Sequence, residues 1–180
     1  MKWIKIVFFI LLITNCAKKE EKKSADANSN YYARIHFRQG RAHFYNREYN
    51  KAIESYQKAI RCNPDFTEAH YYLGYVWHTL GEYDSASVEY RKTIELDSKY
   101  ASAHFLLGRI YDRKEMVDKA IKEYEQTIKI EPKYTAAHYY LGKDYERSGN
   151  YKKAIKFYKK YLDSSPNGRH AEEIRKILKL

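Results

Sequence analysis

Histidine and cysteine are the side chains in this sequence whose types and spacing could do chemistry. Four of the seven histidines recur every 34 residues, at His36, His70, His104 and His138, and such a ladder could bind metal ions or relay protons. However, equivalent residues on successive packed helices lie about 8–10 Å apart, whereas ligands that share one zinc ion must each come within about 2.1 Å of it. We therefore expect these histidines to be structural, and we expect no metal site.

The sequence holds none of the motifs that mark a catalytic or cofactor site. It lacks the paired CxxC and HExxH metal motifs, a glycine-rich phosphate loop and a serine nucleophile elbow. Its two cysteines, Cys16 and Cys62, are too few for a disulfide-stapled scaffold. Cys62 occupies a place on a predicted helix that suits a small buried apolar residue. We therefore expect a protein that is not an enzyme and that needs no cofactor.

The first residues of the chain have the order of an export signal. Lys2 and Lys5 precede an apolar run, Ile6–Ile13, that is too short to span a bilayer, for which about 20 residues are needed. The run leads into the letters ITNC, which end at Cys16 and resemble the lipobox of bacterial lipoproteins, although Asn15 departs from the small residue usual before the cysteine. The resemblance implies a signal peptide over residues 1–15 and a lipid on Cys16. The alternative is an ordinary signal peptide with an unmodified cysteine.

The stretch that follows has the composition of a flexible tether. Residues 17–30 read AKKEEKKSADANSN, with no apolar side chain larger than alanine, so burial cannot offset the entropy of ordering. We assign residues 16–32 to the lipidated cysteine and the charged tether; a frayed helix of mixed lysine and glutamate is the alternative. Export and the anchor predict a location at the outer membrane or on the periplasmic side rather than in the cytoplasm.

A repeat of 34 residues organises the rest of the chain. The letters AHYYLG occur at residues 69–74 and 137–142, and the similar AHFLLG at 103–108 lies midway between them. Four repeats follow without insertion, over residues 33–66, 67–100, 101–134 and 135–168. Within each repeat, apolar residues recur at helical spacing on both sides of a central break. The sequence contains only 7 Gly and 3 Pro, too few for the turns that a many-stranded β fold needs. Each repeat is therefore predicted to be a helical hairpin.

These repeats resemble the tetratricopeptide repeat, a 34-residue helical hairpin with small and aromatic residues at set places. The resemblance implies an all-α fold, a right-handed superhelical solenoid of four hairpins, with residues 169–180 as a C-terminal capping helix. It places Gly40, Gly74, Gly108 and Gly142 where the two helices of a hairpin pack closely, and Tyr161 departs from the small residue typical of its place. Eleven tyrosines fall at core places of the repeat: Tyr49, Tyr56, Tyr83, Tyr90, Tyr100, Tyr111, Tyr124, Tyr134, Tyr145, Tyr151 and Tyr158.

In this family the first helix of each hairpin lines the concave surface, and the fifth and ninth places of the repeat face into it. The resemblance therefore implies a groove of aromatic and basic side chains, suited to a peptide with acidic and apolar side chains; packing alone is the alternative reason for tyrosine at the fifth place. The family's clamp for the carboxylates of heat-shock chaperones is absent, because Phe37 and Tyr72 stand where it needs lysine and asparagine. The predicted groove residues are Phe37, Arg41, Tyr71, Tyr75, Phe105, Arg109, Tyr139 and Lys143.

The net charge of +11 leaves anionic partners open. Five lysines between Lys152 and Lys160 lie on the predicted second helix of the fourth repeat. They form either a solvated face or a contact for anionic lipid or an acidic partner. Nucleic acid is disfavoured as a partner, because export removes the chain from the cytosol.

We expect a non-enzymatic scaffold in the bacterial cell envelope that binds a protein or peptide partner and reaches the membrane through its lipid anchor. A regulatory or adaptor subunit of a peptidoglycan hydrolase or protease, and a surface adhesin, are the alternatives.

Overall fold

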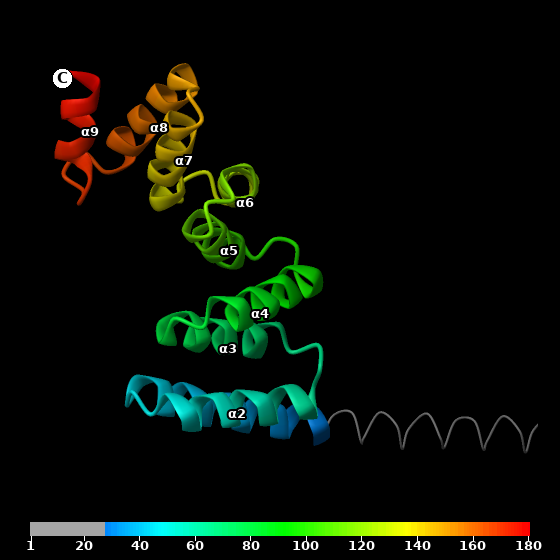
Figure 1. Cartoon of the computed structure of the whole chain (residues 1–180). Helices are drawn as coiled ribbons and strands as arrows, with labels where there is room; N and C mark the ends of the chain where they lie inside the picture. Colours follow the sequence, from blue (N-terminus) through cyan, green and yellow to red (C-terminus); the bar gives the residue numbers. More distant parts are fainter. Residues whose placement is uncertain (1–27) are drawn as a thin grey trace, which may run out of the picture. The chain divides into compact units, whose positions relative to one another are not determined.

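The structure, a computed structural model, describes residues 28–180 (Figure 1). Helices are the regular secondary structure of this part of the chain, so the predicted all-α class is confirmed. The predicted signal peptide at residues 1–15 and the predicted lipidation site Cys16 lie outside the described residues. A first helix covers residues 28–45, and it is followed by α2 (Tyr49–Cys62), α3 (Thr67–Leu80), α4 (Tyr83–Leu96), α5 (Ala101–Arg113), α6 (Val117–Ile130), α7 (Thr135–Arg147), α8 (Tyr151–Ser164) and α9 (Ala171–Leu178).

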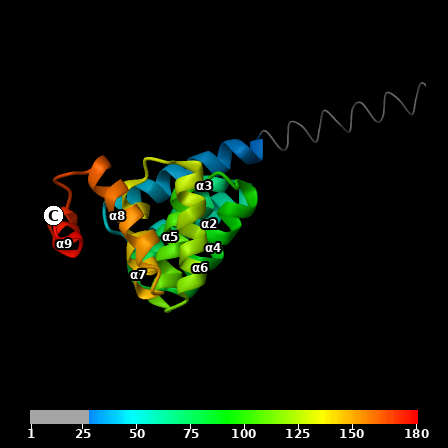
Figure 2. The same cartoon turned by 90° about the horizontal axis from the view of Figure 1, so that it is seen from above.

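Contacts divide the chain into two compact units, unit 1 ending at Val76 and unit 2 spanning Trp77–Leu180. In unit 1 the first helix packs against α2. In unit 2, α5 packs on α6 and α7 on α8, while α4 lies against α5, α6 against α7 and α9 against α8, an order that can be followed in Figure 1 and Figure 2. In unit 2, α5 with α6 and α7 with α8 therefore form helical hairpins, and α9 packs on the last of them.

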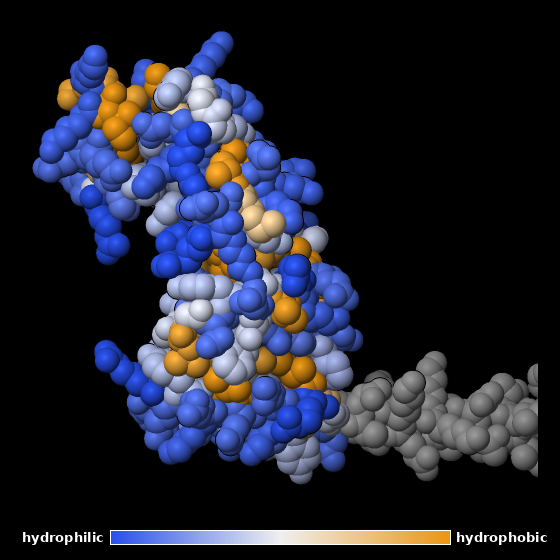
Figure 3. Space-filling model, in the orientation of Figure 1, coloured by the Kyte–Doolittle hydropathy of each residue, from blue (hydrophilic) through white to orange (hydrophobic). Residues whose placement is uncertain are grey.

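On the face of the molecule drawn in Figure 3, hydrophilic residues predominate and apolar residues form small separate patches. Among residues 28–180, none of the helices combines the length and the apolar composition needed to cross a membrane.

The turn inside each hairpin has one conformation, which repeats with the period of the sequence. The residue at the fifteenth place has a positive φ in every repeat: 61° at Arg47, 85° at Gly81, 57° at Glu115 and 77° at Gly149. The N–H of the next residue donates to the carbonyl five residues before it, at 2.7–2.9 Å in the four turns, which is the long hydrogen bond of a Schellman cap. Glycine adopts this φ without steric cost, so the backbone is strained only in the two turns that use arginine or glutamate.

The glycine at the eighth place of a repeat lets a tyrosine ring from the second helix of the hairpin lie against the backbone of the first helix. A Cβ atom at Gly40 would come within 2.7 Å of the Tyr56 ring, and one at Gly108 within 2.7 Å of the Tyr124 ring. In the fourth repeat the equivalent distance is 2.5 Å. The tyrosine rings concerned are almost completely buried. The close approach of the two helices, which the family resemblance implies, is confirmed at Gly40, Gly108 and Gly142.

The recurring histidines connect the turns between hairpins to the first helices. Nε2 of His70, His104 and His138 donates to the carbonyl of the residue six positions earlier, at 2.9, 3.1 and 2.8 Å. Nδ1 of His104 also lies 2.7 Å from a carboxylate oxygen of Glu123. Burial by itself lowers the pKa of His104, but the Glu123 carboxylate and the Ser98 carbonyl raise it above its ordinary value. Across residues 28–180, no three His, Cys, Asp or Glu side chains are placed to share a metal ion.

The end of the predicted tether is part of the first helix. Residues 28–32, the last part of the range 16–32 assigned to the tether, are helical. The hydroxyl of Ser29 donates to the carbonyl of Cys62, and the side-chain amide of Asn63 donates to Asn30 at 2.6 Å. Polar contacts with the end of α2 thus hold this turn without apolar burial, which is why a composition argument missed it.

The tyrosines assigned to the core divide into three groups. The five at Tyr56, Tyr90, Tyr124, Tyr145 and Tyr158 are buried, as predicted. Tyr49, Tyr83, Tyr100, Tyr111 and Tyr134 are half-buried. The assignment of Tyr151 to the core was wrong, because this side chain is 65% exposed. Tyr151 is the first residue of α8, where its ring lies outside the contact between α7 and α8.

Candidate functional site

The eight predicted groove residues lie on the first helices of their hairpins. Phe37 and Arg41 lie on the first helix and Tyr71 and Tyr75 on α3, in unit 1; Phe105 and Arg109 lie on α5 and Tyr139 and Lys143 on α7, in unit 2. Phe37 is half-buried, whereas Phe105 and Tyr139 are only 8% and 4% exposed. Phe105, Arg109 and Tyr139 meet in one pocket, and Lys143 lies beside it, with Nζ 5.6 Å from the centre of the Tyr139 ring.

In unit 1, Arg41 lies beside the exposed ring of Tyr45 and the half-buried ring of Tyr72. Its guanidinium carbon is 5.8 Å from the centre of the Tyr72 ring and 5.9 Å from that of Tyr45, within the range of cation–π attraction. The guanidinium also donates to the Tyr45 hydroxyl at 3.5 Å. The rings of Tyr71 and Tyr75 lie 6.3 Å apart on α3. This surface therefore combines a positive charge with aromatic rings, of which those of Tyr45 and Tyr75 are exposed.

In unit 2, a pocket lies between α5, α7 and the segment that leads into α9. Its volume is about 380 Å³, and its walls are mainly apolar. Residues on α5 and α7 supply most of the lining, α8 supplies Tyr161, and the segment before α9 closes one side. The lining residues are Phe105, Arg109, Thr135, Ala136, Tyr139, Tyr140, Tyr161, Arg169 and His170.

Two arginines line this pocket without a carboxylate partner. The guanidinium carbon of Arg109 lies 4.1 Å from the centre of the Tyr140 ring, a cation–π contact that restrains the side chain. Arg169 is exposed on the segment before α9. Within the part of the chain from residue 28 onward, neither arginine forms an ion pair with an aspartate or glutamate. The charge at the edge of the pocket therefore favours an anionic group.

The segment before α9 is held against the pocket by Tyr139 and Tyr161. The His170 ring stacks on the Tyr139 ring, with centres 3.7 Å apart and planes inclined by 12°. The backbone N–H of His170 donates to the Tyr161 hydroxyl at 3.2 Å. The Tyr139 hydroxyl donates to Glu173 at 3.0 Å. Burial, together with that carboxylate, raises the pKa of Tyr139 above its ordinary value, so the phenol stays neutral at physiological pH.

Six of the nine lining residues were not predicted from the sequence: Thr135, Ala136, Tyr140, Tyr161, Arg169 and His170. Tyr140 follows the predicted Tyr139 in the repeated letters AHYYLG, and Tyr161 replaces the small residue typical of its place. Both tyrosines could have been found in the sequence, Tyr140 by its place beside a predicted groove residue and Tyr161 by its departure from the repeat. Arg169 and His170 lie after the last repeat, where the period contains no information about which side chains approach α7.

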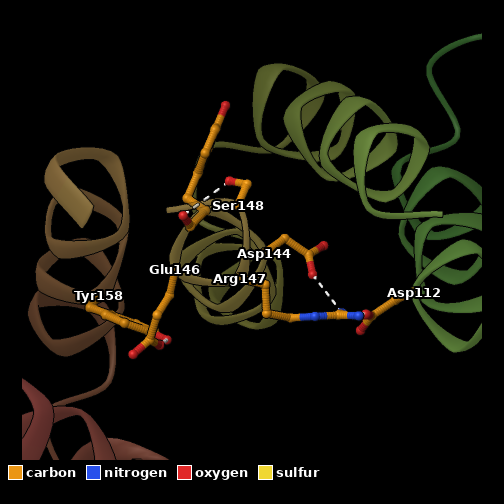
Figure 4. Close-up of polar contacts among 7 residues, drawn as sticks. Asp112, Asp144, Glu146, Arg147, Ser148 and Tyr158 are labelled. Carbon is orange, nitrogen blue, oxygen red and sulfur yellow. Dashed lines mark hydrogen bonds and ion pairs between the residues drawn. The ribbon is translucent and has the colours of Figure 1, made fainter. Parts of the chain in front are cut away.

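A charge cluster, in which Asp144 is buried and Arg147 is exposed, connects α5 and α7 (Figure 4). Asp144 is 1% exposed and occupies the place at which the second and third repeats carry the buried apolar residues Val76 and Ile110. Nη1 of Arg147 donates to Asp112 and, at 3.2 Å, to Oδ1 of Asp144. Oδ2 of Asp144 is buried and has no hydrogen-bond partner within residues 28–180.

Asp144 titrates near neutral pH. Burial and the negative charge of Asp112 raise its pKa to about 7, although Arg147 opposes this shift by favouring the ionised form. Asp144 does not line the pocket. We interpret the cluster as part of the packing between the third and fourth hairpins rather than as a binding site.

Comparison with known proteins identifies the repeats. A family model described as TPR repeat matches residues 40–81 and 77–115, and a second, described as tetratricopeptide repeat, matches residues 105–169. A crystal structure of MamA is 32% identical, over 81% of this chain and 84% of its own, with a TM-score of 0.71. A second MamA crystal structure is 30% identical, over 87% of this chain and 90% of its own, with a TM-score of 0.68.

A more distant structure shares the fold alone. YrrB, described as a TPR protein with an unusual peptide-binding site, is 21% identical over 87% of this chain and 86% of its own, with a TM-score of 0.70. Among proteins of curated function, no sequence matches this chain. Because the family models match most of the chain, and MamA is similar over more than two thirds of it, the chain belongs to the tetratricopeptide repeat family.

Proposed function

We propose that this chain binds a segment of a partner protein in the pocket between α5, α7 and the segment before α9. Tetratricopeptide repeats mediate contacts between proteins. The observation that carries the proposal is an apolar pocket bordered by Arg109 and Arg169, neither of which has a carboxylate partner among residues 28–180. Such a site suits an apolar side chain of the partner that stands next to a carboxylate.

The dimensions and chemistry of the pocket support this choice of ligand. At about 380 Å³ the pocket lies at the lower end of the range for ligand sites in proteins, roughly 300–1,000 Å³, which suits one large side chain. The rings of Phe105 and Tyr139 form apolar walls for it. A guanidinium can bind a carboxylate through two parallel hydrogen bonds, each worth about 1.5–3 kcal/mol because it is charge-assisted. The Tyr140 ring holds Arg109 in place, which lowers the entropy lost on binding.

The aromatic surface of unit 1 is a second contact for the same kind of partner. Arg41 combines a positive charge with the neighbouring rings of Tyr45 and Tyr72. Tyr71 and Tyr75 present further rings on α3. Aromatic side chains with a polar tip bind protein segments well, because they bury apolar area and still offer a hydroxyl.

A peptide-display selection against the full-length chain tests the pocket. Enriched peptides are expected to contain a large apolar residue next to an aspartate or glutamate. The double variant Arg109→Gln/Arg169→Gln should bind these peptides at least about tenfold more weakly, because it loses the charge-assisted hydrogen bonds. The matched control is Arg61→Gln/Arg91→Gln, which removes the same charge from exposed positions outside the pocket. Enrichment of peptides without acidic residues, or equal loss in both variants, would reject the pocket as the binding site.

We further propose that the chain acts as a non-enzymatic scaffold in the bacterial cell envelope, exported and anchored by a lipid on Cys16. The support is the order of the first residues, with Lys2 and Lys5 before an apolar run that ends near Cys16. The variant Cys16→Ala should leave the membrane fraction and lose fatty-acid labelling. Membrane retention and labelling equal to those of the wild type would reject the anchor.

A further inference from the structure

We infer that the outer surface of α8 docks on an anionic phospholipid membrane. This contact is separate from the peptide pocket and from the proposed lipid anchor, and it involves a different side of unit 2. We call this surface the α8 face; it consists of Tyr151, Lys152, Ile155, Lys156, Lys159 and Lys160, all of which are exposed.

The charge of α8 is strongly positive and is not compensated. The helix carries five lysines and a single acidic residue, Asp163. One lysine, Lys153, is directed to α7, where Nζ lies 4.6 Å from the centre of the Tyr145 ring and donates to the Tyr145 hydroxyl at 3.3 Å. The other four make no hydrogen bond or ion pair with residues in the range 28–180. Binding of an anionic surface by these four therefore breaks no existing ion pair.

An apolar pair borders the four lysines on this surface. Tyr151 is 65% exposed and Ile155 is 43% exposed, and a spacing of four residues places them side by side on the helix. Lys152 and Lys159 stand three residues before and four residues after Ile155, so they flank it on the same surface. The opposite side of α8 supplies the residues that pack in the core of unit 2. The exposed pair therefore has little part in holding the fold together.

A phospholipid interface matches both features of the α8 face. Its phosphate groups attract lysines, each of which contributes about 1 kcal/mol near an anionic membrane, or roughly a fivefold change in binding. Its boundary between headgroups and acyl chains accepts tyrosine and isoleucine side chains on the apolar part of a helix. An acidic protein surface would satisfy the lysines but would leave the apolar pair exposed to water. We therefore favour the membrane over an acidic protein.

Vesicle binding by the full-length chain tests the inference. All proteins carry Cys16→Ala, so that no lipid is attached and residues 1–27 contribute equally to every measurement. Binding is measured by co-sedimentation with vesicles of equimolar phosphatidylglycerol and phosphatidylcholine, and with vesicles of phosphatidylcholine alone. The test variant is Lys152→Gln/Lys156→Gln/Lys159→Gln. The matched control, Lys58→Gln/Lys122→Gln/Lys129→Gln, removes the same charge from exposed positions on α2 and α6.

The wild type should prefer the anionic vesicles, and this preference should weaken as salt is added. The test variant should lose about 100-fold in binding to the anionic vesicles, at roughly fivefold per lysine, while the control loses less than about threefold. The variant Tyr151→Ser/Ile155→Ser should lose about tenfold or more at every salt concentration, since burial of apolar area is not screened. The inference is overturned if the wild type shows no anionic preference, if both lysine variants lose binding equally, or if the serine variant binds like the wild type.

Discussion

Replacing the buried Asp144 by valine should stabilise the protein, and the gain should depend on pH. The second repeat already carries a buried valine, Val76, at the equivalent place, so the side chain fits the helix contact. Valine removes a carboxyl group that is 1% exposed and has one oxygen without a hydrogen-bond partner in the described part of the chain. Arg147 keeps its contact with Asp112, so the substitution leaves no unpaired buried charge.

The magnitude follows from the titration of Asp144. Its pKa rises from 3.8 to about 7 in the folded chain, so between these two values the folded chain holds a proton that the unfolded chain has released. Stability of the wild type therefore falls as pH rises through this window, by about 1.4 kcal/mol per pH unit, and levels off above about pH 7. From about pH 5 to about pH 8 the penalty from Asp144 grows by roughly 2–3 kcal/mol. The valine variant lacks this penalty, so the difference between its free energy of unfolding and that of the wild type should grow by the same amount over this pH range.

Urea unfolding followed by circular dichroism, at several pH values from about 5 to about 8, measures this advantage as a difference in the free energy of unfolding. Asp163→Val is the control, because it removes an exposed carboxylate from α8. Its difference from the wild type measures the effect of removing a carboxylate from an exposed position. If the difference for Asp144→Val is independent of pH, the reasoning from burial to a neutral-range pKa is refuted.

Three further substitutions test the packing of the repeats. Gly108→Ala should lower the free energy of unfolding by about 1–3 kcal/mol, because the new Cβ would lie 2.7 Å from the Tyr124 ring; a neutral result in urea unfolding would show that the two helices separate easily. Glu115→Gly should raise it by up to about 1 kcal/mol, because φ is 57° there, and the same assay would count a loss of stability against the strain argument. Glu123→Gln should lower the pKa of His104 in an NMR titration, since the carboxylate stabilises the protonated ring. Because a raised histidine pKa stabilises the fold at low pH and this contribution is lost as pH rises through it, Glu123→Gln should also destabilise the protein more at about pH 5 than at about pH 8, and equal effects would contradict the ion pair.

The sequence by itself determined the hairpin architecture. Glycines, tyrosines and histidines recur at fixed places because each hairpin makes the same local contacts, such as Gly108 against Tyr124 and His104 on the carbonyl of Ser98. These contacts join residues within one repeat or across one turn, so the period of the sequence contains them. The same regularity placed the predicted groove residues on first helices, while their binding role stays a prediction.

Tertiary structure alone decided the features that break the period. Arg169 and His170 follow the last repeat, and only the packing of α9 on α8 brings them to the pocket on α7. Asp144 takes an apolar place, and its pKa lies near 7 because its side chain is buried and because the negative charge of Asp112, on another helix, lies near it. Tyr151 matched a core place in sequence but stands at the exposed start of its helix. Periodic sequence patterns describe contacts that repeat, whereas the charge and shape of a site depend on residues that meet once.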